Sequence, residues 1–275
     1  MIFDYELIDC GQGVRIERFG DRIIKRPCPQ AETWSLKNKA VRTDLVFQRG
    51  SGWHNPSQID EAWPIKVGSV TAHLKLSSQG QIGIFPEQFD NWQWIDKTIT
   101  AHTNRPIKIL NTFAYTGMST LFASQSHTEV CHVDGAKSAL AWAKQNALSS
   151  GKQENAIRWI CDDVISFMAR EIRRQQHYDA IILDPPAFGR GAKKDFKIER
   201  DLPTLLDLIN QLLSPNPRFV ILTCHAPDLF TATDFKQKLE ALPAFKGRKA
   251  EALNLTIPSK NGNPLPSSFG ARISF

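Results

Sequence analysis

From Pro106 onward, short apolar runs alternate with longer segments in which apolar residues recur every three or four positions. Short runs are typical of buried strands, and the longer spacing is typical of helices. The predicted strands are 107–110, 129–133, 156–161, 178–183 and 219–223, and the predicted helices are 116–124, 136–148, 164–174 and 202–213. The short runs do not alternate strictly with polar residues, which indicates strands covered on both faces. This succession predicts a parallel, doubly wound α/β sheet, whose ligand lies beyond the carboxyl ends of the strands.

The chain before residue 95 has a different pattern, with short strands separated by turns. Turns at 11–13 and 20–22 predict hairpins between strands 5–7, 14–19 and 23–25, and Gly68 predicts another between 63–66 and 70–76. The polar stretch 35–42 predicts a short helix. We therefore expect a small β-rich N-terminal domain and connector over residues 1–94, and a larger α/β domain over residues 95–275.

Composition adds a weak indication of the partner. The 275 residues carry a formal net charge of +6, which favours polyanionic partners such as nucleic acid. Basic residues gather at two places, namely Arg170, Arg173 and Arg174 on a predicted helix, and Arg190, Lys193, Lys194 and Lys197 after two prolines. A solvated surface explains either group equally well. The second group has the stronger functional interpretation, because it follows the predicted active site and can contact phosphates.

Several classes of protein are disfavoured by the sequence. The five cysteines are far apart and form no CxxC pair, so neither a disulfide framework nor a structural zinc site is expected. The seven histidines show no HxH or HExxH spacing, so no metal is predicted. No apolar run approaches the ~20 residues that a membrane span needs. The N-terminus lacks a signal-peptide pattern, so we expect a cytoplasmic location without a membrane partner.

Acidic residues follow three successive predicted strands, at positions where packing alone favours apolar residues. Asp134 follows the second strand, where a carboxylate can accept hydrogen bonds from both ribose hydroxyls and disfavours a phosphorylated ribose. Asp162 and Asp163 follow the third strand, where a carboxylate can accept from an adenine amino group. Asp163 equally fits the N-cap of the next helix. Asp184 follows the fourth strand.

The turn after the first predicted strand carries a lone glycine, Gly117, at the start of the next helix. Glycine there lets the backbone come close to a ligand. A dinucleotide-binding fold would favour GxGxxG at this turn to hold a pyrophosphate, and that pattern is absent. The turn therefore favours a nucleoside without phosphates.

A rigid polar segment, Asp184-Pro185-Pro186, ends the fourth strand and is followed by Phe188. The prolines fix the backbone and donate no hydrogen bonds, which leaves nearby carbonyls to accept from a ligand amine. Phe188 offers a flat face on which a base can stack. The alternative interpretation is an ordinary end of a strand with a core phenylalanine.

Taken together, these motifs resemble class I S-adenosylmethionine-dependent methyltransferases. More narrowly, they resemble the bacterial large-subunit ribosomal RNA methyltransferase family, which includes cytosine-C5 and guanine-N7 enzymes. The matching segments are 111–117, Val133-Asp134, Asp162-Asp163 and Asp184-Pro185-Pro186, and 83–88 resembles the segment that precedes the catalytic core. Met118 departs from the pattern, since many relatives have a second glycine there. The resemblance implies a Rossmann-like, mostly parallel seven-stranded sheet and S-adenosyl-L-methionine as cofactor.

The resemblance also implies roles for individual residues. Phe113, Tyr115 and Gly117 would line the methionine part of the cofactor, while Phe85 and Gln88 would cover it. The complete set implied to bind the cofactor is Phe85, Gln88, Asn111, Phe113, Tyr115, Gly117, Asp134, Asp162, Asp163 and Asp184. The implied catalytic residues are Asp184, Pro185 and Phe188, and the implied substrate is RNA, with ribosomal RNA favoured.

The target atom is left open by the sequence. A ring nitrogen or exocyclic amine needs only an acceptor such as Asp184, whereas cytosine C5 needs a covalent thiolate. Cys224, followed by His225, is the one candidate thiol, although a buried cysteine at a strand end is the favoured interpretation. We hypothesise that Cys224 is not essential. A methyltransferase for a protein or small molecule, and a non-catalytic RNA-binding protein with this fold, are the alternative functions.

Overall fold

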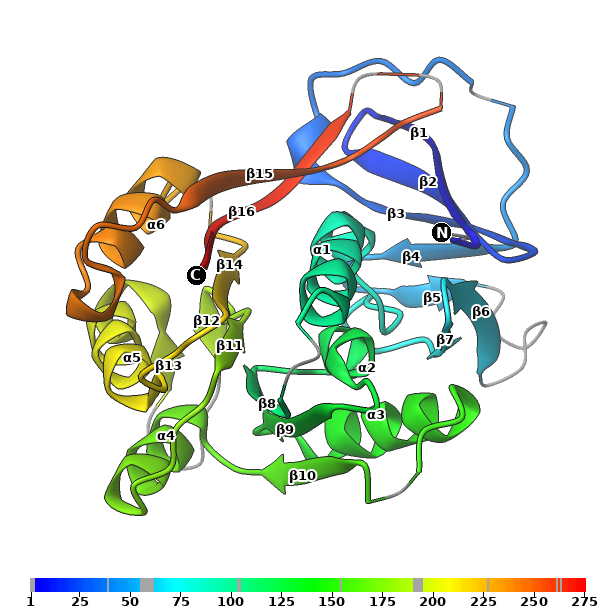
Figure 1. The fold of residues 1–275 in the computed structure, drawn as a ribbon. Coiled ribbons are helices and arrows are strands. Elements are labelled where there is room, and N and C mark those ends of the chain that lie inside the picture. Colours follow the sequence, from blue (N-terminus) through cyan, green and yellow to red (C-terminus); the bar gives the residue numbers. More distant parts are fainter. Residues whose placement is uncertain are drawn as a thin grey trace. The chain divides into compact units, whose positions relative to one another are not determined.

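The computed structural model describes residues 3–38, 40–54, 62–102, 105–153, 155–189, 195–226, 228–260, 262 and 264–275. The chain divides into two compact units, each formed from three segments. The first comprises Met1–Phe89, Gln145–Gly151 and Thr256–Ser267, and the second comprises Asp90–Lys144, Lys152–Leu255 and Ser268–Phe275. Figure 1 shows the elements of both. The domain boundary after residue 94 stays a prediction.

The first unit contains a five-stranded sheet and a separate hairpin. The sheet has the order β1-β2-β3-β4-β5, with β1 (Tyr5–Gly11), β2 (Val14–Phe19), β3 (Arg22–Pro27), β4 (Leu45–Gln48) and β5 (Gly52–His54). The hairpin consists of β6 (Trp63–Val67) and β7 (Val70–Leu74), and η1 (Pro29–Ala31) and η3 (Pro86–Gln88) are short 3-10 turns. The predicted hairpins at 11–13, 20–22 and Gly68 are confirmed.

Residues from both ends of the sequence form one core in the first unit. Leu7 and Ala31 pack there with Ile257 and Leu265. A buried ion pair also lies in this unit, where Arg26 Nη2 donates to Glu17 Oε2 at 2.6 Å. The early hairpins therefore depend on a segment some 250 residues later in the chain for part of their core.

The predicted helix over 35–42 is wrong, since none of its described residues is helical. The backbone N–H groups of Lys37 and Asn38 each donate to the carboxylate of Asp9 at 2.8 Å. Asp9 is buried, so these bonds satisfy its charge. These bonds tie residues 37 and 38 to Asp9 on β1 in a non-helical conformation.

The second unit contains a seven-stranded sheet of the order β10-β9-β8-β11-β14-β16-β15. Its strands are β8 (Ile107–Thr112), β9 (Thr128–Asp134), β10 (Ile157–Cys161), β11 (Ala180–Leu183), β14 (Phe219–Cys224), β15 (Glu251–Ile257) and β16 (Leu265–Ser274), the last two reaching into the first unit. The strands from β10 to β14 pair in parallel, and β16 is antiparallel to β14. The predicted doubly wound, mostly parallel seven-stranded sheet is confirmed.

Helices cover both faces of this sheet, as Figure 1 shows. One face packs against α4 (Val164–Arg173), α5 (Ile198–Leu212) and α6 (Ala232–Glu240), and the other against α1 (Phe89–Thr100) and α2 (Met118–Ala123). The remaining elements are α3 (Lys137–Ser149), the turn η4 (Pro243–Phe245) and a small hairpin of β12 (Phe188–Gly189) and β13 (Phe196–Lys197). No helix within the described residues is long and apolar enough to span a membrane.

Candidate active site

The carboxyl ends of β10, β9, β8 and β11 lie side by side along one margin of the sheet, called here the carboxyl edge. Thr112 pairs with both Val133 and Leu183, so the residues that follow in each strand, Asp134 and Asp184, lie level with Phe113. Neighbouring strands are about 4.8 Å apart, which puts Asp134 and Asp184 about 10 Å apart across β8. The strand order reverses beside β8, where an open α/β sheet binds its ligand.

Asp134 holds the turn after β8 in place. Its Oδ2 accepts the backbone N–H of Tyr115, and its Oδ1 accepts that of Ala136, both at 2.8 Å. Burial raises the pKa of this carboxyl, although the two backbone N–H groups oppose the shift. Each carboxylate oxygen accepts one N–H and keeps a further lone pair. Asp134 can therefore support the turn and still accept hydrogen bonds from two hydroxyl groups.

The turn itself has an unusual backbone. Phe113 and Tyr115 have φ angles of 53° and 47°, in the left-handed region that bulky residues seldom occupy. Gly117 follows with a φ of 86°, and a Cβ added to it would lie 3.0 Å from the Cβ of Ala143. Three left-handed residues within five positions make a tight loop over the end of β8. Strained backbone of this kind is concentrated at functional sites.

A buried polar network lies beneath the turn. Asn111 Nδ2 donates to Thr120 Oγ1 at 2.8 Å, and Thr120 Oγ1 lies 2.9 Å from His132 Nδ1. Burial lowers the pKa of His132 to about 3, so the ring is neutral. The network joins β8, α2 and β9. Asn111 is thus directed at α2 in the structure, and its predicted contact with the cofactor stays a prediction.

Asp162 and Asp163 follow β10 and have different partners. Asp162 forms an ion pair with Arg170, and its Oδ1 accepts the backbone N–H of Asp163 at 2.8 Å. Asp163 is the N-cap of α4, because its side chain accepts the N–H of Ser166. The N-cap interpretation of Asp163 is therefore confirmed. The predicted contact of either carboxylate with adenine stays a prediction.

The segment after β11 forms an exposed lip at the carboxyl edge. Thr223 Oγ1, on neighbouring β14, donates to Asp184 Oδ1 at 2.7 Å and orients this carboxylate. Pro185 is buried and Pro186 is exposed. Phe188 is 51% exposed, so it is not a core phenylalanine. An acid and an accessible aromatic ring are thus four residues apart on a stiff segment.

The structure adds residues that sequence reasoning missed. The ring of Phe196, on β13, lies 5.2 Å from that of Phe113, and Trp142, on α3, lies 6.1 Å from Tyr115. Both contacts join the turn after β8 to segments far away in the sequence. No local pattern in the sequence marks either residue, since an isolated aromatic is most often part of a core.

Cys224 ends β14 and is fully buried. Burial and the nearby charge of Asp184 raise the pKa of its thiol to about 12. The thiolate is the nucleophilic form of cysteine, and at neutral pH it is scarcely populated at this position. These surroundings are those of a structural cysteine.

Further predicted residues belong to the first unit, to α4 and its C-cap, or to positions outside the described residues. Phe85 and Gln88 belong to the first unit, where Gln88 is buried and its backbone N–H donates to the carbonyl of Phe85. Their role as a cover for the cofactor stays a prediction. Arg190, Lys193 and Lys194 lie outside the described residues. Arg170 on α4 and Arg174 at its C-cap form ion pairs with Asp162 and Glu171, respectively, while Arg173 is exposed.

The residues at the carboxyl edge fit an adenosyl group without phosphates. Asp134 has lone pairs for two hydroxyl donors. Gly117 has a positive φ, and a Cβ there would be crowded against Ala143. The carboxylates of Asp134, Asp162 and Asp184 would repel a phosphate. Among the described residues, no group of three or more His, Cys, Asp or Glu side chains is placed to hold a metal ion.

Comparisons with known proteins agree with this geometry. A family model described as S-adenosylmethionine-dependent methyltransferase matches residues 38–249. The crystal structure of the SAM-dependent methyltransferase from Agrobacterium tumefaciens superposes with a TM-score of 0.91 and is 32% identical, covering 98% of this chain and 90% of that chain.

Two curated relatives are ribosomal RNA methyltransferases. Ribosomal RNA large subunit methyltransferase I of Aeromonas salmonicida is 25% identical over 88% of this chain and 59% of its own length. Methyltransferase K/L of Shewanella sp. strain MR-4 is 30% identical over 77% of this chain and 29% of its own length. The chain thus spans less than two thirds of these relatives. Since the family model covers most of the chain and the sheet matches a solved member, the protein belongs to the S-adenosylmethionine-dependent methyltransferase family.

Proposed function

We propose that this protein transfers a methyl group from S-adenosylmethionine to a base in RNA, with ribosomal RNA as the favoured substrate. The observation that carries the proposal is the carboxyl edge, where Asp134 beside a strained glycine turn lies about 10 Å from the lip of Asp184, Pro185 and Phe188. The named relatives that act on ribosomal RNA support the choice of substrate. The domain division at residue 94 and a cytoplasmic location remain parts of the proposal.

The two sides of the edge have separate tasks. Asp134 binds the ribose hydroxyls, Phe113, Tyr115 and Gly117 line the methionine part, and Asp162 and Asp163 lie at the adenine end. Asn111 supports the turn through Thr120. When bound, S-adenosylmethionine supplies an electrophilic methyl group. The side chains at the lip need only to orient the acceptor and exclude water.

The lip suits a nitrogen acceptor. Asp184, held by Thr223, accepts a hydrogen bond from a ring N–H or an exocyclic amine, and the carbonyl of Pro185 can accept another. Phe188 is exposed and stacks the base once it is turned out of its helix, a contact worth about 1–3 kcal/mol. A carbon acceptor would need a thiolate. The only cysteine near Asp184 among the described residues, Cys224, is buried with a raised pKa.

A Cys224→Ser variant is therefore expected to keep a kcat within about threefold of the unaltered protein, because a protonated, buried thiol is no nucleophile. Transfer of labelled methyl groups to ribosomal RNA measures the rate, and cofactor titration confirms an intact pocket. Complete loss of turnover with normal cofactor binding would show that Cys224 attacks the base, and would favour cytosine C5 as the target.

The proposed function itself is tested by mass spectrometry of ribosomal RNA nucleosides from cells that lack the protein. One methylated nucleoside should disappear, and a plasmid encoding the unaltered protein should restore it. The same plasmid encoding Asp184→Ala should not. An unchanged set of nucleosides would instead point to a protein or small-molecule acceptor.

A further inference from the structure

A concave site lies at the opposite margin of the sheet in the second unit, called here the amino edge. It is a pocket of about 420 Å³ lined by residues 215–218 before β14, by Ala244, Lys246 and Arg248 near η4, and by Phe275 after β16. Phe219 pairs with Ser274, so both strands bring their ends to this margin. Because β14 spans six residues, the pocket lies roughly 20 Å from the carboxyl edge.

The pocket is positively charged. Arg218, Lys246 and Arg248 line it, and no acidic residue does. None of these three side chains forms an ion pair with another described residue, whereas Arg105, Arg158 and Arg272 of the same unit are paired with carboxylates. The Nε of Arg218 is buried and has no hydrogen-bond partner among the described residues. The side chains that line the pocket therefore carry a net positive charge.

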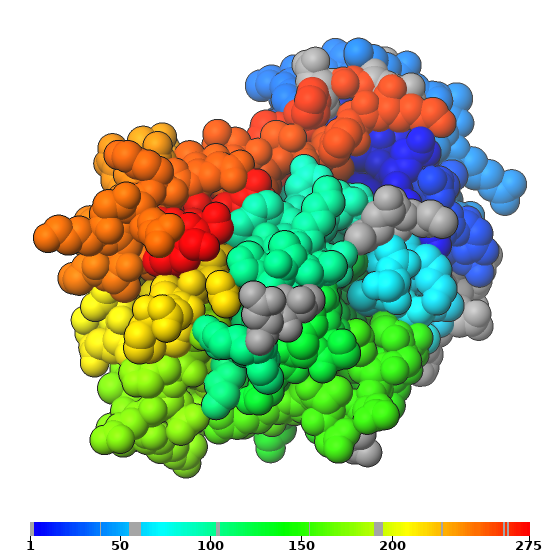
Figure 2. Space-filling model, in the orientation of Figure 1, coloured from blue at the N-terminus to red at the C-terminus, as the bar shows by residue number. Residues whose placement is uncertain are grey.

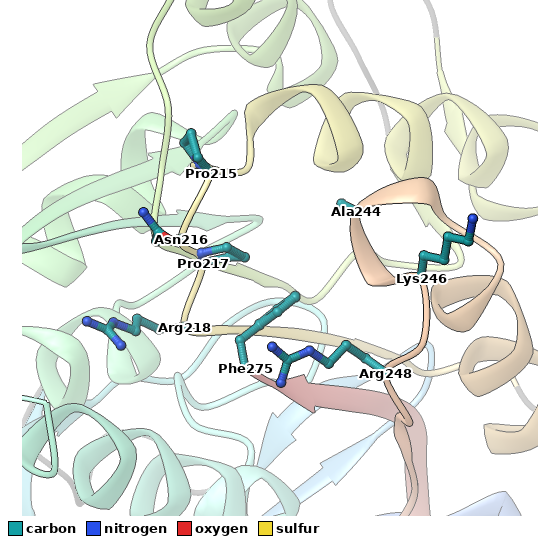
Figure 3. Close-up of a pocket in the computed structure, with 8 residues that line it drawn as sticks. All are labelled: Pro215, Asn216, Pro217, Arg218, Ala244, Lys246, Arg248 and Phe275. Carbon is teal, nitrogen blue, oxygen red and sulfur yellow. The ribbon is translucent and has the colours of Figure 1, made fainter.

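The pocket is also built from stiff and aromatic parts. The guanidinium carbon of Arg248 lies 5.3 Å from the ring centroid of Phe275, and the N–H of Phe275 donates to the carbonyl of Arg218 at 2.9 Å. Figure 3 shows Arg248 beside the Phe275 ring, with Pro217 across from them and Lys246 extending away. In Figure 2 the red C-terminal end is exposed at the surface between orange and yellow residues. Arg248 is exposed and lies beside the Phe275 ring.

We propose that this pocket binds a backbone phosphate of the RNA substrate, away from the base that is methylated. The inference rests on the proposed function, since it takes the substrate to be RNA. A guanidinium binds phosphate oxygens in pairs, and an arginine held against a ring loses less freedom on binding. At roughly 20 Å from Asp184, the pocket would position the RNA without contacting the reacting atoms. It would raise affinity rather than the rate of the chemical step.

The test compares two double variants that each remove two positive charges from the second unit. Lys246→Gln/Arg248→Gln removes them from the pocket, and Lys97→Gln/Arg173→Gln removes exposed cations on α1 and α4. Binding of a fluorescent single-stranded RNA of ~20 nucleotides is measured from low to moderate salt, together with KM and kcat on ribosomal RNA. Thermal melting and cofactor titration confirm that both variants are folded.

The pocket variant is expected to bind RNA about tenfold more weakly, and its plot of log affinity against log salt should be shallower by about 0.7, since one phosphate contact is lost. KM should rise while kcat stays the same, and the control should match the unaltered protein. The inference would be overturned if both variants lost the same RNA affinity, or if the pocket variant lost none. Either result would leave the proposed methylation of RNA untouched. If the unaltered protein neither binds nor methylates RNA, the proposed function fails as well.

Discussion

An Asp184→Ala variant is expected to methylate ribosomal RNA about a thousandfold more slowly than the unaltered protein. Asp184 is the carboxylate that the lip presents to the acceptor, and holding two reacting groups in the right geometry can contribute more than a thousandfold in rate. The hydrogen bond from Thr223, at 2.7 Å, shows that the orientation of this carboxylate is fixed by the neighbouring strand. Single-turnover transfer of labelled methyl groups measures the loss.

The control for this variant is Asp207→Ala, which removes an exposed carboxylate on α5 and should keep full activity. Thr223→Val should give an intermediate loss of about tenfold, because it leaves Asp184 in place without its partner. If Asp184→Ala stays within tenfold of the unaltered rate, the acceptor is held by another group, and the assignment of the lip is wrong.

An Asp134→Ala variant is expected to bind S-adenosylmethionine about a hundredfold more weakly. It loses the acceptor for the ribose hydroxyls, and it also frees the backbone N–H groups of Tyr115 and Ala136 that shape the turn. Hydrogen bonds to a charged group contribute about 1.5–3 kcal/mol each. Calorimetric titration measures the affinity, with Glu129→Ala, at the exposed opposite end of β9, as the matched control.

The pH dependence of cofactor binding gives a second readout of Asp134. Burial raises its pKa, so in the free protein the carboxylate takes up its proton at a higher pH than an exposed aspartate does. Only the ionised form offers both oxygens as acceptors. Affinity should therefore fall as the pH is lowered through this raised pKa, and the fall should be absent in Asp134→Ala. A flat profile in the unaltered protein would show that Asp134 does not contact the ligand.

After residue 106, the helices and strands could be predicted from the sequence wherever a local pattern of apolar residues marks them. Strands such as β9 and β14, and helices such as α3 and α4, lie within one or two residues of the predicted bounds. Each strand is a short apolar run, and each helix is a segment whose apolar residues recur at helical spacing. Parallel strands bring their carboxyl ends to one margin. The acids at those ends could therefore be grouped without knowledge of any contact.

Four of the longer elements were not predicted, although three of them carry a recognisable signal. On α1, the buried positions 92, 95 and 99 follow helical spacing, and α6 begins with a capping box of Thr231 and Asp234. On β15, buried Leu253, Leu255 and Ile257 alternate with exposed residues. The fourth element, β16, mixes buried and exposed positions without a clear period, because it continues from one unit into the other.

Parts of the candidate site depend on contacts that a sequence does not display. The left-handed backbone of Phe113 and Tyr115 runs against the preference of bulky residues, so only the surrounding structure can impose it. Similarly, the ion pair of Asp162 with Arg170 and the hydrogen bond of Thr223 to Asp184 each join different elements. The partners of side chains at strand ends depend on which elements are neighbours in the sheet. Local patterns in the sequence do not determine that arrangement.

The most direct test of the account is a crystal structure of the protein with S-adenosylhomocysteine. The account predicts density along the carboxyl edge, with the ribose hydroxyls against Asp134, adenine beside Asp162 and Asp163, and the sulfur facing Asp184 and Pro185. A ligand bound elsewhere, or in the opposite direction along the edge, would contradict it.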